Sequence, residues 1–318
     1  MAHLPFAQLL QAHSPAQSFT HKRYKYMEFL SYLIIGISLG SVYAIIALGY
    51  TMVYGIAKML NFAHGDVIMV GGYISLTAML SMNLPPIVAI LLAMVVCTVL
   101  GVIIEGLAYK PLRSAPSLAV LITAIGVSYF LQNSALLIWG ANPKSYTPII
   151  EGAVKLFEGK LSISYISLLT MASCIIIMIV LSLFINKTQL GKAMRACSED
   201  KGAAQLMGIN VNRTISLTFA IGSALAAIAG VLLCSSYTSL MPTTGSMPGI
   251  KAFTAAVFGG IGSIPGAFLG GILLGIIESL AKAYISTQLA NSIVFAVLIL
   301  TLLIRPAGLM GKYVPEKV

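Results

Sequence analysis

Apolar runs of about 20 residues alternate with short polar segments along the chain, and this pattern constrains the fold more than any other feature. A run of that length lets an α-helix cross a bilayer while satisfying its backbone polar groups internally. Charged residues make up only 9% of the 318 positions, whereas soluble domains carry about 25%. The sequence therefore predicts an all-α polytopic membrane protein.

The apolar runs predict about eight to nine transmembrane helices. The expected full spans are about 29–54, 67–82, 87–109, 118–139, 163–185, 215–235, 267–284 and 292–304. A further apolar run, 252–258, is too short to cross alone and ends at Gly259-Gly-Ile-Gly-Ser-Ile-Pro-Gly266. We expect one short broken or re-entrant segment here, because broken backbone at membrane depth is tolerated only inside protein or beside a water-filled cavity.

Small residues at four-residue spacing predict close packing between these helices. Gly36 and Gly40 have this spacing in the first span. The run after the broken segment carries two such ridges, which consist of Gly262, Gly266 and Gly270, and of Gly271 and Gly275. The alternative is that the glycines around Pro265 form a hinge or a cavity wall.

The two ends of the chain are polar. Residues 1–26 end in His21-Lys-Arg-Tyr-Lys25 and have no apolar core of signal-peptide length. We expect them to be an appended leader or an upstream start, since Met27 opens the first apolar run. The membrane domain is then expected over 27–312, followed by a tail at 313–318.

The longest polar interruption, 186–214, carries five of the chain's 19 basic residues, which is typical of a cytoplasmic loop. With this loop inside, alternation places 56–66 and 110–117 inside and 83–86, 140–161 and 236–250 outside. The net charge of +10 is spread over several short loops, which indicates topology and not a nucleic-acid patch. The same alternation places the start of the first span outside, and basic residues after the last span favour a cytoplasmic C-terminus. An outside start and an inside end require an odd number of crossings.

The loop 186–214 also has helix signals. Ser198 can cap a short surface helix, Glu199–Asp200 would lie in its first turn, and Gly208 is placed for a left-handed C-terminal residue. Asn210 or Asn212 can cap the next span. The loop is either an ordinary basic connector or a docking element for a cytoplasmic partner.

Motifs for chemistry are missing from the sequence. Gly191-Lys192 is followed by alanine and lacks the first glycine of a phosphate-binding loop. There is no H-E-x-x-H, no C-x-x-C and no serine nucleophile elbow. His64 and Asp66 have no third ligand nearby for a metal. The sequence therefore predicts no catalytic residue, no metal site and no cofactor.

A few polar or conformationally special residues within the apolar regions are candidates for a translocation pathway. The candidates are Asn61, His64, Gln132, Asn133, Gly260, Gly262 and Pro265. Other roles stay open, since Asn61 and Asp66 can cap the second span, and Gln132 and Asn133 can bond to a neighbouring helix. Glu105 and Glu278 lie near span ends, where an acid is either functional or a structural or interfacial charge.

Several motifs in order resemble the LivH-type permease of bacterial branched-chain amino acid importers, over about residues 27–312. The motifs are Gly40-Ser-Val-Tyr-Ala-Ile-Ile-Ala-Leu-Gly-Tyr-Thr-Met-Val-Tyr-Gly55, Asn61-Phe-Ala-His-Gly-Asp66, Gly191-Lys-Ala-Met-Arg-Ala196, Phe258-Gly-Gly-Ile-Gly-Ser-Ile-Pro-Gly266 and Arg305-Pro-Ala-Gly-Leu-Met-Gly311. The resemblance implies an importer of the bacterial inner membrane with a second permease subunit, two cytoplasmic ATP-binding subunits and a periplasmic substrate-binding protein.

The resemblance also implies that 191–209 meets the ATP-binding subunits. The expected coupling residues are Gly191, Arg195, Ala196, Lys201, Ala204, Met207 and Gly208. The chain itself would carry branched-chain or related hydrophobic amino acids by alternating access, without chemistry. The alternatives are a permease for urea, amides or other amino acids, a self-sufficient secondary carrier or channel, and a membrane scaffold.

Overall fold

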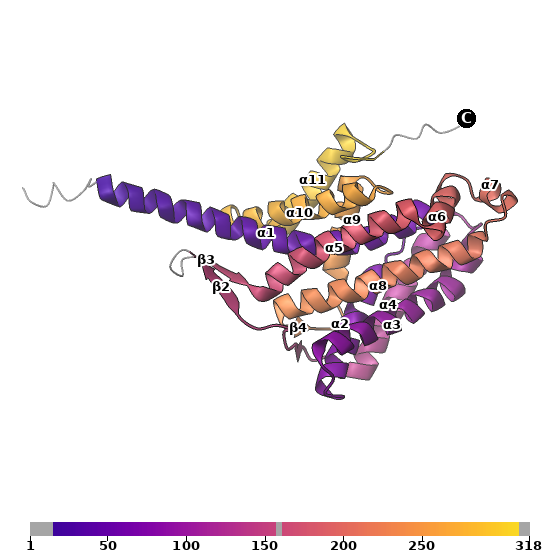
Figure 1. The fold of residues 1–318 in the computed structure, drawn as a ribbon, viewed down its shortest axis with the longest axis horizontal. Helices are drawn as coiled ribbons and strands as arrows, with labels where there is room; N and C mark the ends of the chain where they lie inside the picture. The colour runs from indigo at the N-terminus through magenta and orange to yellow at the C-terminus, as the bar shows by residue number, and fades with distance from the viewer. Residues whose placement is uncertain (1–14, 157–160, 312–318) are drawn as a thin grey trace, which may run out of the picture.

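The computed structural model describes residues 15–156 and 161–311, with side chains from Tyr26 onwards, and most of these residues are helical (Figure 1). The helices are α1 (Pro15–Ala57), α2 (His64–Leu80), α3 (Pro86–Ile104), α4 (Ser117–Trp139), α5 (Tyr165–Lys187), α6 (Gln189–Glu199), α7 (Lys201–Leu206), α8 (Val211–Tyr237), α9 (Ser246–Gly259), α10 (Ile264–Tyr284) and α11 (Ala290–Ile304). A π-helical turn, Glu105–Tyr109, and a 3-10 turn, Lys110–Leu112, continue α3. Residues 1–14 of the expected leader and the expected tail 313–318 lie outside the described residues.

Six helices in the described part of the chain are long and apolar enough to cross a membrane. They are α1 from Tyr26, α3 with its continuation to Leu112, α4, α5, α8 and α10. The chain is therefore a polytopic helical membrane protein, but the expected count of eight to nine spans is not confirmed. The helices α2, α9 and α11 are apolar but have only 17, 14 and 15 residues.

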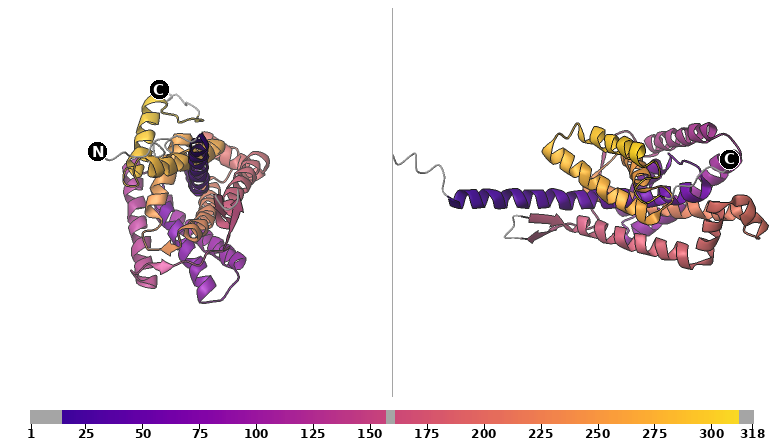
Figure 2. Two further views of the ribbon diagram at one scale, coloured as in Figure 1. Left: turned by 90° about the vertical axis from the view of Figure 1, so that its left-hand side faces the viewer. Right: turned by 90° about the horizontal axis from the view of Figure 1, so that it is seen from above.

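The helix α8 lies at the centre of the bundle, with 78% of its most apolar stretch buried, against 17% in both α4 and α5 (Figures 1 and 2). The helices α1, α2 and α3 all pack against it. The outer helices keep their large apolar side chains exposed, which suits lipid contact. In Figure 2 the N-terminal part of α1 extends beyond the other helices.

Small residues allow α1 and α10 to pack with their backbones in contact, as the glycine spacing predicted. Any side chain on Gly275 would overlap the backbone of Gly40, and a Cβ on Gly36 would lie 2.8 Å from the Cα of Ile276. Gly270 packs equally closely against α9. Gly262 is an exception, because it lies in the turn before α10 with φ of 93° and does not belong to a helical ridge.

Two short antiparallel ribbons lie at the end of the bundle opposite α6 and α7 (Figure 1). One joins β1 (Lys144–Ser145) to β4 (Ser239–Leu240), and the other joins β2 (Ala153–Leu156) to β3 (Leu161–Ser164). The loops 140–161 and 236–250, predicted to share the outer side, therefore meet at one end. Which end faces the cytoplasm stays a prediction from the basic residues.

Helix ends in the polar loop were predicted only in part. Gly208 has φ of 82°, and the Asn210 side chain accepts a hydrogen bond from the backbone N–H of Arg213 at 3.0 Å, both as expected. Ser198 does not begin a helix, because α6 continues to Glu199. Asp200 instead caps α7, since its Oδ1 accepts from the N–H groups of the second and third residues of that helix.

Candidate functional site

The N-termini of α2 and α9 meet inside the bundle. Gly65, in the first turn of α2, contacts Gly245 and Gly249 so closely that a Cβ on Gly65 would lie 2.7 Å from the Gly245 carbonyl oxygen. His64, at the start of α2, lies beside Gly222, which is 11 residues into α8 and so about 16 Å from its start. The two helices therefore begin about halfway along the central helix, which explains why both are short.

The helix α4 joins this junction through Gln132. Its Nε2 donates to Oδ1 of Asp66 in α2 at 2.9 Å and contacts Oγ of Ser246, the first residue of α9, at 3.2 Å. Oγ of Ser128, one turn earlier in α4, lies 3.3 Å away. Since Asp66 lies in the first turn of α2, its carboxylate also counters the positive end of the helix dipole.

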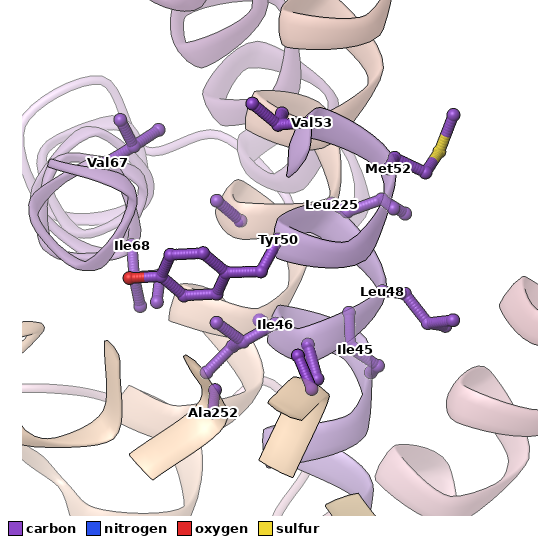
Figure 3. Packing of buried hydrophobic residues seen from close by; sticks show 14 of the residues in the cluster. Ile45, Ile46, Leu48, Tyr50, Met52, Val53, Val67, Ile68, Leu225 and Ala252 are labelled. Carbon is purple, nitrogen blue, oxygen red and sulfur yellow. The ribbon is translucent and has the colours of Figure 1, made fainter. Parts of the chain in front are cut away.

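The His64 side chain is fully enclosed between α1 and α8. A Cβ on Gly49 would lie 2.5 Å from its Nε2, so the site exists only because α1 has a glycine there. The ring of Tyr50 packs edge-on against the imidazole with centroids 4.7 Å apart, and Figure 3 shows this ring reaching from α1 toward α2. Among the described residues, Nε2 of His64 has no hydrogen-bond partner.

Asn61 lies in the irregular segment 58–63 that connects α1 to the junction. Its Oδ1 accepts from the hydroxyl of Tyr109 at 2.9 Å, so it ties this segment to the end of α3. Neither Asn61 nor Asp66 caps α2 with its side chain, because the N-cap is Ala63 and has no side-chain bond. This corrects the capping alternative.

Asn133, Gly260, Gly262 and Pro265 do not lie at the junction. Asn133 is exposed, and its amide donates to the carbonyl of Tyr129 in its own helix at 2.7 Å. The glycines lie at the far end of α9, where Gly262 faces Gly55 near the end of α1. The segment 305–311 folds back there, and the N–H groups of residues 309 and 310 bond to the last carbonyls of α9. The expected break in the chain is therefore a capped turn, and the interruption inside the bundle is at the other end of α9.

The two acids that the sequence left open are both buried in ion pairs. Glu105 pairs with Arg113, and Oγ of Ser216 in α8 donates to its Oε2 at 2.6 Å. It therefore holds the end of α3 against α8. Glu278 pairs with Lys251 at 2.7 Å and with Lys282 at 2.6 Å. Reasoning from the sequence missed Lys251, since one lysine next to an apolar run carries no signal of its partner.

Five of the seven expected coupling residues lie on the two short helices α6 and α7, and Met207 and Gly208 follow directly after α7. Thr188 caps α6, and Gly191 is required there because any side chain would overlap the backbone at the end of α5. Lys201 donates to the carbonyl oxygen of Ala57, the last residue of α1, at 2.8 Å. We expected Ala204 to contact a partner. It is only 3% exposed and packs inside the chain, so its side chain is not available to one.

The exposed apolar residues of this region follow at the end of α7. Leu206 is 90% and Met207 83% exposed, beside the turn made by Gly208. Arg195 is exposed on α6, while Ala196 packs partly against the core. An apolar pair on a polar loop is suited to contact another protein, so we retain Met207 and add Leu206 as the candidate docking residues.

Positive charges gather at the same end of the bundle. Burial, followed by the positive charges of Arg113 and Lys58, lowers the pKa of Lys201. The three residues come from the loops 56–66, 110–117 and 186–214, which the basic pattern predicted to share one side. The fold thus brings together the loops that the sequence grouped by charge.

Comparisons with known proteins agree on one family. The family model described as the permease component of the branched-chain amino acid transport system matches residues 32–303. The chain is 45% identical over 301 residues to the high-affinity branched-chain amino acid transport system permease protein BraD of Pseudomonas aeruginosa, a match that covers 91% of this chain and 98% of BraD. It is 45% identical to LivH of Escherichia coli, which bears the same description, over 92% of this chain and 99% of LivH. The autoinducer 2 import system permease protein LsrD of Salmonella paratyphi B is 26% identical over 86% of this chain and 82% of LsrD.

Proposed function

Because this chain belongs to the family of branched-chain amino acid transport permease components, we propose that it is the membrane permease subunit of an ATP-driven importer for leucine, isoleucine and valine. The observation that carries the proposal is about 45% identity to BraD and LivH over more than nine tenths of the chain. The chain has no phosphate-binding loop, so ATP hydrolysis belongs to separate cytoplasmic subunits. A second permease subunit and a substrate-binding protein at the β-ribbon end complete the importer, in a bacterial inner membrane.

We infer that the junction of α2 and α9 is the element that moves. Two helices that begin inside the bundle can separate without breaking a continuous span, and discontinuous helices of this kind occur at transporter binding sites. Glycines at the contact leave no side chains to interlock, while the bonds from Gln132 hold the two ends together. Closure and opening of this contact would alternate access to the pathway.

A continuous set of contacts joins the docking region to the junction. Lys201 of α7 donates a hydrogen bond to the carbonyl oxygen of Ala57, the last residue of α1. The segment 58–63 connects Ala57 to His64. Movement of α7 by an ATP-binding subunit would pull on this segment and change the start of α2. Measurements of coupling between α7 and the junction test this route.

The experiment is uptake by proteoliposomes that contain this chain with its co-purified permease and ATP-binding subunits. With binding protein outside and ATP inside, radiolabelled leucine should accumulate, and without ATP it should not. Accumulation without ATP under an ion gradient would instead identify a secondary carrier. Since LsrD serves a different import system, urea, an amide and a polar amino acid belong in the same substrate panel.

A further inference from the structure

A buried cluster of charges joins three helices near the β-ribbon end of the bundle. Glu278 of α10 is fully buried, and the hydroxyl of Tyr43 in α1 donates to its Oε2 at 2.9 Å. Its Oε1 accepts from Nζ of Lys251 in α9 at 2.7 Å and lies 2.6 Å from Nζ of Lys282. The Lys251 side chain is 8% exposed and that of Lys282 is 38% exposed.

A cavity of about 230 Å³ opens beside this cluster. Leu39, Leu233 and Met247 supply an apolar wall, and Ser239 and Thr244 lie at its polar side. Pockets for drug-sized ligands are about 300–1,000 Å³, so this one suits a smaller solute. It lies along the first turns of α9, whose N-terminus forms the junction with α2.

The charges of the cluster do not balance. Two ammonium groups face one carboxylate, which leaves one excess positive charge shared by the buried Lys251 and the more exposed Lys282. Each lysine Nζ carries three N–H donors, and the contact with Glu278 occupies only one of them. A carboxylate in the cavity would use the remaining donors. A simple anion would offer nothing to Glu278, whereas a zwitterion brings a carboxylate for the two lysines and an ammonium group that can donate to Glu278.

We propose that this cavity is a transit site for a free amino acid with an aliphatic side chain. The substrate carboxylate binds Lys251 and Lys282, its ammonium group contacts Glu278, and its side chain packs against Leu39 and Leu233. This proposal rests on the proposed import function. It adds that the permease itself, and not only the binding protein, holds the substrate in its zwitterionic form. Because Tyr43, Lys251 and Lys282 already occupy three of the about four acceptor positions of Glu278, little capacity is left for the ammonium group, which keeps binding weak and allows release.

The same contacts also fasten α9 to α10 and α1, so loss of uptake in a Lys251 variant would not separate binding from structure. Occupancy of the cavity is therefore the quantity to measure. In a cysteine-free version of the chain within the assembled complex, Ser239→Cys places a thiol on the cavity wall. Thr243→Cys is the matched control, since Thr243 is exposed on the same loop and does not line the cavity.

The rate of modification by a small methanethiosulfonate reagent is measured with and without L-leucine, in the absence of binding protein. For a Kd of about 1 mM, roughly 10 mM leucine should slow the reaction at Ser239→Cys about tenfold. Leucinamide, which lacks the carboxylate, and 4-methylpentanoate, which lacks the ammonium group, should protect little. Thr243→Cys should react at one rate throughout. Adding Lys251→Met should abolish protection while the thiol stays reactive.

Equal protection by all three compounds, or none by leucine, would overturn the site, and neither result depends on whether Lys251→Met folds. The two proposals fail in different ways. ATP-driven leucine uptake by the complex with an unprotected Ser239→Cys would remove the transit site and leave the importer intact. Absence of uptake of any branched-chain amino acid would overturn the importer itself.

Discussion

Gln132→Leu tests whether the junction of α2 and α9 depends on a single amide. The substitution keeps a side chain of similar size but removes the donor to Asp66 at 2.9 Å and to Ser246 at 3.2 Å. A hydrogen bond to a charged group contributes about 1.5–3 kcal/mol and a neutral one about 0.5–1.5 kcal/mol. Loss of both should destabilise the junction by roughly 2–4 kcal/mol, and the buried Asp66 would be left short of a donor.

The next residue in the chain is the matched control. Asn133→Leu removes an amide that is exposed and bonds only to the carbonyl of Tyr129 in its own helix, so it should leave the junction unchanged. Since 1.4 kcal/mol corresponds to a factor of ten, Gln132→Leu should lower ATP-driven leucine uptake about tenfold or more. Its melting midpoint in detergent, followed by size-exclusion chromatography, should also fall by several degrees.

Two results would refute this reasoning. Uptake and melting of Gln132→Leu within about twofold and one degree of the wild type would mean that the amide contributes less than about 0.5 kcal/mol. Equal losses of uptake and stability in Gln132→Leu and Asn133→Leu would mean that any substitution in this part of α4 has the same effect. In the first case the junction would be held by backbone contact between its glycines, and in the second the loss would not be specific to the amide of Gln132.

The remaining predictions test orientation, docking and packing. In a cysteine-free version, Ser198→Cys and Thr243→Cys should react with an impermeant reagent from opposite sides of the membrane, and reaction of both from outside would reverse the topology. Leu206→Glu should reduce recovery of the ATP-binding subunits in a pull-down while the permease still inserts, because it places a charge at the exposed apolar end of α7; full recovery with normal uptake would leave this loop a plain connector. Gly275→Val should prevent stable assembly, since its side chain would overlap the α1 backbone, whereas Gly262→Ala meets no atom within 4 Å and should cost only the strain of its positive φ, about 1–3 kcal/mol. Thermal melting of Gly275→Val and Gly262→Ala measures this difference in stability. A stable Gly275→Val would contradict the close packing of α1 and α10.

Some features followed from the sequence alone because they depend on one stretch of chain. The length and apolarity of a run decide whether a helix can cross a bilayer, so six of the eight expected full spans were located to within a few residues, and 67–82 and 292–304 correspond to shorter helices. The left-handed turn at Gly208 and the cap by Asn210 are equally local. The basic loops were grouped correctly onto one end because positive charge is excluded from lipid and collects on one side.

The junction and the ion pairs were decided only by the tertiary structure. Hydropathy measures how apolar a run is, but not the membrane depth at which its helix begins relative to the neighbouring helices. The meeting of α2 with α9 depends on contact between Gly65 and Gly245, which are far apart in the chain. Lys251 likewise lies 27 residues from Glu278, and no local pattern marks the two as partners. Such contacts arise when buried polar groups must find hydrogen bonds inside a bundle, and the packing of the helices determines which groups meet.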